Sequence, residues 1–256
     1  MIPWVKLDTS IIPGGTEELR LMRRSAEFSI MLGHNELMNS RLSGSEEALA
    51  TLSCARIRQR RNAHILIGGL GMGFTLRAAL GAAAPDASIT VAELVPAVTA
   101  WARGPMADLH GTSLDDPRVT VHQGDVGQLI RSGRSAYDAI LLDIDNGPAG
   151  LTRAANDSLY DAVGLGLAQV ALKPGGVLAI WSAAPDRPFT KLLHKMGFAV
   201  EEVQVRAKAG RSGARHVIWL ASVETTPRRG PPQKPRSKAR QSVATKPPRR
   251  DMGRST

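Results

Sequence analysis

Between residues 64 and 182 the sequence alternates short apolar runs with longer stretches of helical character. The runs are continuous rather than alternating, which is typical of strands buried on both faces of a parallel sheet. Strands separated by helices predict a doubly wound α/β sheet that is covered on both faces. The apolar runs lie at residues 65–67, 89–94, 119–122, 139–142 and 177–181, and the helical stretches at 74–84, 97–107, after Asp125 and at 158–172.

Segments of another kind flank this alternation. Turn signals at residues 13–15 and 33–35 separate short strand-like segments, so residues 1–43 are predicted to form a small antiparallel β element. Residues 43–57 follow as a capped amphipathic helix. Lys173-Pro174-Gly175-Gly176 is predicted to be the turn between the helix at 158–172 and the next strand.

The last strands of the predicted sheet come after a further helix at residues 189–195. Residues 200–205 and 216–221 alternate apolar and polar side chains and are joined by a glycine-containing loop. This pattern predicts an antiparallel hairpin at the edge of the sheet. The sheet is therefore expected to be mostly parallel and seven-stranded, a Rossmann-like arrangement within residues 44–224.

Residues 225–256 differ in composition from the rest of the chain. They carry ten of the lysines and arginines, six prolines and one acidic residue, Asp251, in a chain of net charge +10. Such a segment buries too little apolar surface to offset the entropy of ordering, so we expect a disordered basic tail. It either contacts anionic surfaces or nucleic acid weakly or serves only as a solvated extension.

The cysteine count and the hydropathy pattern indicate the cellular compartment of the protein. Cys54 is the only cysteine, which excludes a disulfide within the chain and favours a reducing environment. The first residues lack the pattern of a signal peptide, and the uncharged stretches are shorter than the roughly 20 residues of a membrane span. We therefore expect a cytoplasmic protein without a membrane segment.

The first chemical motif is a glycine loop. Gly69, Gly71 and Gly73 occupy alternate positions directly after a predicted strand and before a predicted helix. Glycine allows a tight turn there and lets a ligand approach the backbone, so a nucleotide-like ligand is expected. A dinucleotide fingerprint requires glycine where Phe74 stands, which disfavours NAD. The alternative is a purely structural turn between strand and helix.

Acidic residues follow the next two strands. Glu93 ends the second strand, 20 residues after Gly73, where a carboxylate accepts hydrogen bonds from both hydroxyls of a ribose. Asp125 follows the third strand and offers a carboxylate to an adenine amino group, with the Val126 backbone as a donor. The plainer alternative is that these side chains are simply solvated.

The fourth strand delivers two more carboxylates, Asp143 and Asp145, to the same edge of the sheet. A carboxylate at this position can hold an ammonium group or take its proton, which frees an amine for attack. Asp145 and Asn146 also suit a simple turn. The six histidines are scattered, and no metal site is predicted.

These motifs, in this order, resemble the class I S-adenosylmethionine-dependent methyltransferase fold and, within it, the spermidine synthase (polyamine aminopropyltransferase) family. Residues 68–77 are similar to the family's glycine loop, with Leu76 and Arg77 in register. Residues 137–143 are similar to its Tyr-Asp-x-Ile-x-x-Asp segment, and residues 159–176 to its stretch ending in Leu-x-Pro-Gly-Gly. The helix start at residues 45–49 also resembles that family.

The resemblance implies transfer of an aminopropyl group from decarboxylated S-adenosylmethionine to a diamine such as putrescine, with release of methylthioadenosine. It places Glu93 at the ribose, Asp125 at the adenine and Asp143 at the amine. It also implies self-association, for example as a homodimer, and no metal.

Two positions depart from the family pattern. Its glycine-loop acid corresponds to Met72, and the second aspartate of its catalytic motif corresponds to Asn146, so Asp145 is the nearest replacement. Loss of the acid at Met72 favours an alternative, a methyltransferase that uses intact S-adenosylmethionine. A third possibility is a non-catalytic protein with a vestigial nucleotide pocket.

Overall fold

The computed structural model describes residues 2–144, 147–148, 158–208 and 213–223. The chain divides into two units, Met1–Thr225 and Thr226–Thr256, and the description concerns the first. The predicted tail at residues 225–256 lies outside the described residues. The boundary predicted between residues 43 and 44 stays a prediction.

A seven-stranded sheet forms the centre of the first unit, with strand order β10-β11-β9-β8-β5-β6-β7. Strands β5 to β9 pair in parallel, whereas β11 is antiparallel to both β9 and β10. The predicted mostly parallel sheet and its antiparallel edge hairpin are thus confirmed. The strands are β5 (His64–Gly68), β6 (Ser88–Glu93), β7 (Val119–Gln123), β8 (Tyr137–Leu142), β9 (Leu172–Ser182), β10 (Phe198–Arg206) and β11 (Arg215–Val223).

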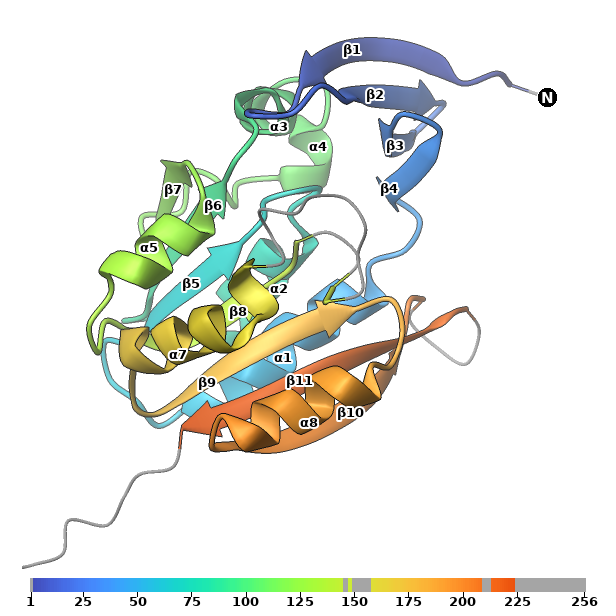
Figure 1. Ribbon diagram of the computed structural model, residues 1–256. Helices are drawn as coiled ribbons and strands as arrows, with labels where there is room; N and C mark the ends of the chain where they lie inside the picture. The colour runs from blue at the N-terminus through green and yellow to red at the C-terminus, as the bar shows by residue number, and fades with distance from the viewer. Residues whose placement is uncertain (1, 145–146, 149–157, 209–212, 224–256) are drawn as a thin grey trace, which may run out of the picture. The chain divides into compact units, whose positions relative to one another are not determined.

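Helices cover both faces of this sheet, which explains its continuous apolar strands. Every residue of the central strand β8 is buried. Figure 1 shows α5 (Val126–Ser132), α7 (Ala162–Ala171) and α8 (Arg187–Lys195) on one face, and α1 (Gly44–Ile57) and α2 (Phe74–Ala82) on the other. Successive residues of one strand point into different cores: Ile65 and Ile67 pack in one, Leu66 in the other.

A separate four-stranded antiparallel sheet precedes α1, as predicted. It consists of β1 (Val5–Ile11), β2 (Glu18–Arg24), β3 (Glu27–Leu32) and β4 (Asn35–Asn39) in sequential order. Its apolar side chains Leu19, Leu21 and Ile30 join the core on the α1 and α2 side of the large sheet. Trp101 Nε1 also donates to Asp8 at 2.6 Å, which ties β1 to α3 (Pro96–Arg103).

Two of the predicted helices are longer than the helices in the structure. The stretch predicted at residues 97–107 consists of α3 and a separate short helix, α4 (Ala107–His110), because Gly104 and Pro105 interrupt it. The stretch predicted at residues 158–172 breaks at Asp161, whose side chain accepts from Gly164 N at 2.8 Å and caps α7. A side-chain cap of this kind starts a new helix rather than continuing one.

Two local predictions also need correction. Residues 173–176 lie inside β9 as an irregularity, since Tyr137 pairs with Leu172 but Ala139 pairs with Val177. Ser43 stands at the N-cap of α1, but its side chain makes no capping hydrogen bond. The backbone carbonyl of Ser43 accepts from Glu47 N at 2.9 Å instead.

Candidate active site

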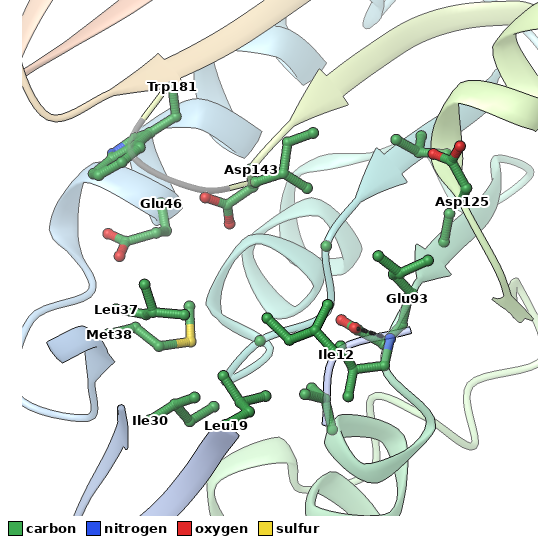
Figure 2. Close-up of a pocket in the computed structure, with 18 of the residues that line it drawn as sticks. Ile12, Leu19, Ile30, Leu37, Met38, Glu46, Glu93, Asp125, Asp143 and Trp181 are labelled. Carbon is green, nitrogen blue, oxygen red and sulfur yellow. Dashed lines mark hydrogen bonds between the residues drawn. The ribbon is translucent and has the colours of Figure 1, made fainter. Parts of the chain in front are cut away.

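A cavity of about 320 Å³ lies at the carboxyl ends of the parallel strands. This is where open α/β sheets bind ligands, and the volume suits a small molecule. The segments that follow β5, β6, β7 and β8 supply one side of it, and the N-terminal sheet, α1, β9 and β11 supply the other (Figure 2). The strand-end residues that line it are Gly69, Gly71, Glu93, Leu94, Gly124, Asp125, Val126, Asp143 and Ile144.

The glycine loop between β5 and α2 contributes Gly69 and Gly71 to the cavity wall. Gly69 has φ +91°, and a Cβ there would lie 2.3 Å from the carbonyl oxygen of Asp143. Any side chain at this position would therefore separate the loop from the end of β8. Gly73 is not among the lining residues; it has φ +75° and packs against the ring of His110 at the start of α2.

Glu93 ends β6 and lines the cavity, but it also holds the glycine loop. Its Oε2 accepts from Leu70 N at 2.9 Å, and its Oε1 accepts from Val95 N at 2.8 Å. Burial raises the pKa of the Glu93 carboxyl, although these backbone donors oppose the shift. Gly71 and Leu94 are further backbone donors to this carboxylate, so its observed role is to fix the loop, and the ribose contact predicted for it stays a prediction.

Asp125 begins α5 and lines the cavity together with Gly124 and Val126. Its Oδ1 accepts from Gly127 N at 2.8 Å, which caps the helix. The capping bond accounts for its position without any ligand. The carboxylate nevertheless lines the cavity, and the adenine contact predicted for it stays a prediction.

Asp143 follows β8, and its side chain points into the cavity (Figure 2). Thr75 in the first turn of α2 donates from Oγ1 to Asp143 Oδ2 at 2.5 Å. Burial and the nearby negative charge of Glu46 raise the pKa of Asp143 to about 7. Asp145 and Asn146 lie outside the described residues, so the role predicted for Asp145 stays a prediction.

The sequence reasoning missed Glu46, His216 and Trp181, which line the same cavity. Glu46 lies in the first turn of α1, His216 near the start of β11 and Trp181 near the end of β9. An acidic residue in the first turn is ordinary for a helix, so Glu46 gave no separate signal. The three come together only because α1 packs beside β9 and β11.

The N-terminal sheet and the segment after it form an apolar wall across from the strand ends. Met38 packs against the glycine loop, since a Cβ on Gly71 would lie 2.6 Å from its Cε. Met72, at the position of the family's loop acid, is 1% exposed and is not among the residues that line the cavity. The apolar side chains of this wall are Ile12, Leu19, Ile30, Leu37, Met38 and Leu42.

The charged residues of the lining are acidic, and Arg131 outside it pairs with one of them, Asp125, at 3.4 Å. Glu46, Glu93, Asp125 and Asp143 supply four carboxylates, and among the described lining residues there is no lysine or arginine. Such a cavity favours a cationic ligand over an anionic one. Within the described part of the chain, no group of three or more His, Cys, Asp or Glu side chains is placed to hold a metal ion. No described helix is long and apolar enough to cross a membrane.

Comparison with known proteins gives one similar sequence and several similar folds. No protein-family model matches the chain. It is 33% identical over 153 residues to polyamine aminopropyltransferase 1 of Streptomyces coelicolor, a match over 56% of this chain and 28% of that protein. The chain thus spans less than a third of the length of that relative.

Solved structures agree on the fold. A spermidine synthase in complex with the transition state analogue AdoDATO has a TM-score of 0.66 and 16% identity, and covers 86% of this chain and 73% of its own. The spermidine synthase of Thermotoga maritima has a TM-score of 0.67 and 15% identity, with the same coverage. The chain therefore has the fold of the spermidine synthases and is similar in sequence to a polyamine aminopropyltransferase.

Proposed function

We propose that this chain is a spermidine synthase-like transferase. It moves an aminopropyl group from decarboxylated S-adenosylmethionine to a diamine such as putrescine and releases methylthioadenosine. The observation that carries the proposal is the charge of the cavity, four carboxylates with no lysine or arginine among the described lining residues. A sulfonium donor and an ammonium acceptor are both cations, and this lining suits both.

Residues at different strand ends are assigned to different parts of the donor. Gly69 and Gly71 line the part of the cavity assigned to the nucleoside, and Glu93 at the end of β6 is assigned to the ribose hydroxyls. Asp125 and the Val126 backbone serve the adenine. Gly73 supports the loop from behind, and Asp145 stays a candidate for the amine side.

The chemistry asks little of the protein beyond alignment and proton removal, because a sulfonium is already a good leaving group. The acceptor nitrogen attacks as a free amine, so its ammonium must first lose a proton. A carboxyl whose pKa is about 7, as for Asp143, is suited to take a proton near neutral pH. The apolar side chains Leu37, Met38 and Trp181 suit the methylene spacer of a diamine.

The cavity lining also bears on the methyltransferase alternative. Intact S-adenosylmethionine carries a carboxylate, which the ionised acidic side chains of the lining would repel. Met72 is buried and does not line the cavity, so the family's loop acid has no counterpart at this position, and the donor assignment rests on the other acidic side chains. We keep decarboxylated S-adenosylmethionine as the donor and S-adenosylmethionine as the comparison.

The test is a product assay with the full-length chain. The protein is incubated with decarboxylated or intact S-adenosylmethionine and, separately, putrescine, cadaverine or 1,3-diaminopropane, and products are identified by mass spectrometry. We expect methylthioadenosine and an aminopropylated amine only with the decarboxylated donor. S-adenosylhomocysteine and a methylated amine from the intact donor would overturn the proposal.

A further inference from the structure

Glu46 is the one acidic residue of the cavity that comes from α1 rather than from a strand end. Its carboxylate is held from behind by two hydrogen-bonded side chains. Ser45 donates from Oγ to Glu46 Oε2 at 2.7 Å, and His216 Nδ1 lies 2.9 Å from the same Ser45 Oγ. The three residues thus form a chain that runs from β11 to the cavity.

The direction of these bonds follows from the single hydroxyl proton of serine. When Glu46 is ionised, Ser45 donates to it and His216 Nδ1–H donates to Ser45. When Glu46 is protonated, both bonds reverse and Nδ1 accepts. Ser45 is fully buried, so these bonds form away from water and hold Glu46 in place in either state.

On its other side Glu46 faces Asp143. Figure 2 shows both side chains at the cavity below Trp181, with the Asp143 carboxylate pointing toward Glu46 and the Glu46 carboxylate extending away from Asp143. Thr75 Oγ1 lies 2.5 Å from Asp143 Oδ2 and 3.4 Å from the backbone oxygen of Glu46, so it joins the two segments. Thr75 thus holds the end of β8 beside α1, and two acids whose charges act on each other across a cavity favour a bound cation.

Titratable groups approach Glu46 from three elements of the fold. Glu47 is its charged neighbour on α1, Asp143 faces it from the end of β8, and His216 approaches from β11. Thr75 and Trp181, which approach from α2 and β9, carry no charge. The Trp181 indole packs edge-on against His216 at 4.9 Å, and its buried Nε1 has no acceptor among the described residues. This indole N–H is therefore available to donate a hydrogen bond to a ligand in the cavity.

We propose that Glu46 and Asp143 form a carboxyl pair that binds the reacting ammonium of the acceptor and takes up its proton, with Ser45 and His216 as positioning residues for Glu46. This inference rests on the proposed aminopropyl transfer. The acceptor N–H bond breaks and the proton goes to the pair. The nitrogen lone pair forms the new N–C bond, and the electrons of the broken S–C bond leave with sulfur as methylthioadenosine.

The decisive variant is Glu46→Gln, with Glu47→Gln as its control. Glu47 lies on the same turn of α1 but does not line the cavity. We expect Glu46→Gln to lower kcat by about 100-fold or more and to remove one ionisation from the pH profile of kcat. Binding of methylthioadenosine should stay as in the unchanged chain. Glu47→Gln should leave kcat and methylthioadenosine binding unchanged and should keep the same number of ionisations in the pH profile, with at most a small shift from the lost charge.

A second readout does not depend on activity. Carbon NMR of labelled Asp143 should show its pKa falling toward the ordinary range in Glu46→Gln, because the charge of Glu46 contributes to the elevation. An unchanged Asp143 titration would overturn the pair even in an active enzyme. If the unchanged chain transfers no aminopropyl group while the titration does shift, the proposed function fails and the pair stands.

The positioning role has its own test. His216→Asn keeps a side-chain N–H that can donate to Ser45, whereas His216→Leu does not. We expect the asparagine variant to retain the pH profile of kcat and the leucine variant to lose it, with methylthioadenosine binding intact in both. Equal pH profiles in the two variants would overturn the role of His216.

Discussion

The backbone N–H of Leu70 donates to Glu93 Oε2 at 2.9 Å. The acid predicted from the sequence to hold a ribose therefore also fastens the glycine loop to the end of β6. One side chain thus organises the loop and faces the cavity, so its removal affects both.

Substitutions at Glu93 should separate these two roles. Glu93→Ala removes the acceptor for Leu70 N and Val95 N and should weaken methylthioadenosine binding by about 1–3 kcal/mol, with some loss of stability. Glu93→Gln keeps one side-chain oxygen and should lose less methylthioadenosine affinity and less stability than Glu93→Ala. Calorimetric binding and urea unfolding check both variants. Unaltered nucleoside affinity in the alanine variant would refute the assignment.

The raised pKa of Asp143 predicts that the stability of the protein falls as the pH rises. Its pKa is raised from an ordinary 3.8 to about 7, so its contribution to stability is fully present below about pH 4 and is lost as the pH rises through about 7. Asp143→Asn removes this loss and should be more stable than the unchanged chain at pH 8, by on the order of 1 kcal/mol. The measurement is urea unfolding at pH 5 and pH 8. A variant that is less stable at pH 8 would contradict the raised pKa.

Gly69→Ala should damage both the loop and the site. Its φ of +91° and the 2.3 Å approach of the Asp143 carbonyl leave no room for a Cβ. We expect a loss of about 1–3 kcal/mol in unfolding free energy and no measurable methylthioadenosine binding. Gly33→Ala is the control, because Gly33 has φ +55° but nothing within 4 Å of an added Cβ. If the two variants behaved alike, crowding at Gly69 would not be the cause.

Asp138 anchors the opposite end of β8 and should matter for stability alone. Burial pushes its pKa up, but hydrogen bonds from Lys173, the His64 backbone and Arg60 hold the pKa below its usual value. Its stabilising contribution is therefore present above about pH 4 and is lost as the pH falls through the lowered pKa. Asp138→Ala at pH 7 should cost about 3 kcal/mol in urea unfolding.

The control for Asp138 is Asp115→Ala. Asp115 pairs with Arg103, but their side chains are 73% and 51% exposed, so the change should stay below about 1 kcal/mol. Nucleoside affinity should be preserved in both variants. Equal stability losses at the two positions would contradict the importance of the buried pair.

The strands and the glycine loop were predictable because their signals are local. The apolar runs that became β5, β6 and β8 are continuous and lie between helices, and the positions of Gly69, Glu93 and Asp143 follow from strand ends. Parallel strands bring such ends to one edge of the sheet. Local pattern was therefore enough for this half of the site.

The other half depends on packing between distant segments. Glu46 and His216 are 170 positions apart, and only the placement of α1 beside β11 connects them through Ser45. The apolar wall contributed by Met38 depends in the same way on how the N-terminal sheet packs against the glycine loop. Periodicity within one segment carries no information about such contacts, so the carboxyl pair was not foreseen.

The most direct test of the account is calorimetric titration of the purified chain with decarboxylated and with intact S-adenosylmethionine. The acidic lining of the cavity predicts that the decarboxylated form binds at least about tenfold more tightly, a difference of about 1.4 kcal/mol. Equal or tighter binding of the intact form would contradict the account.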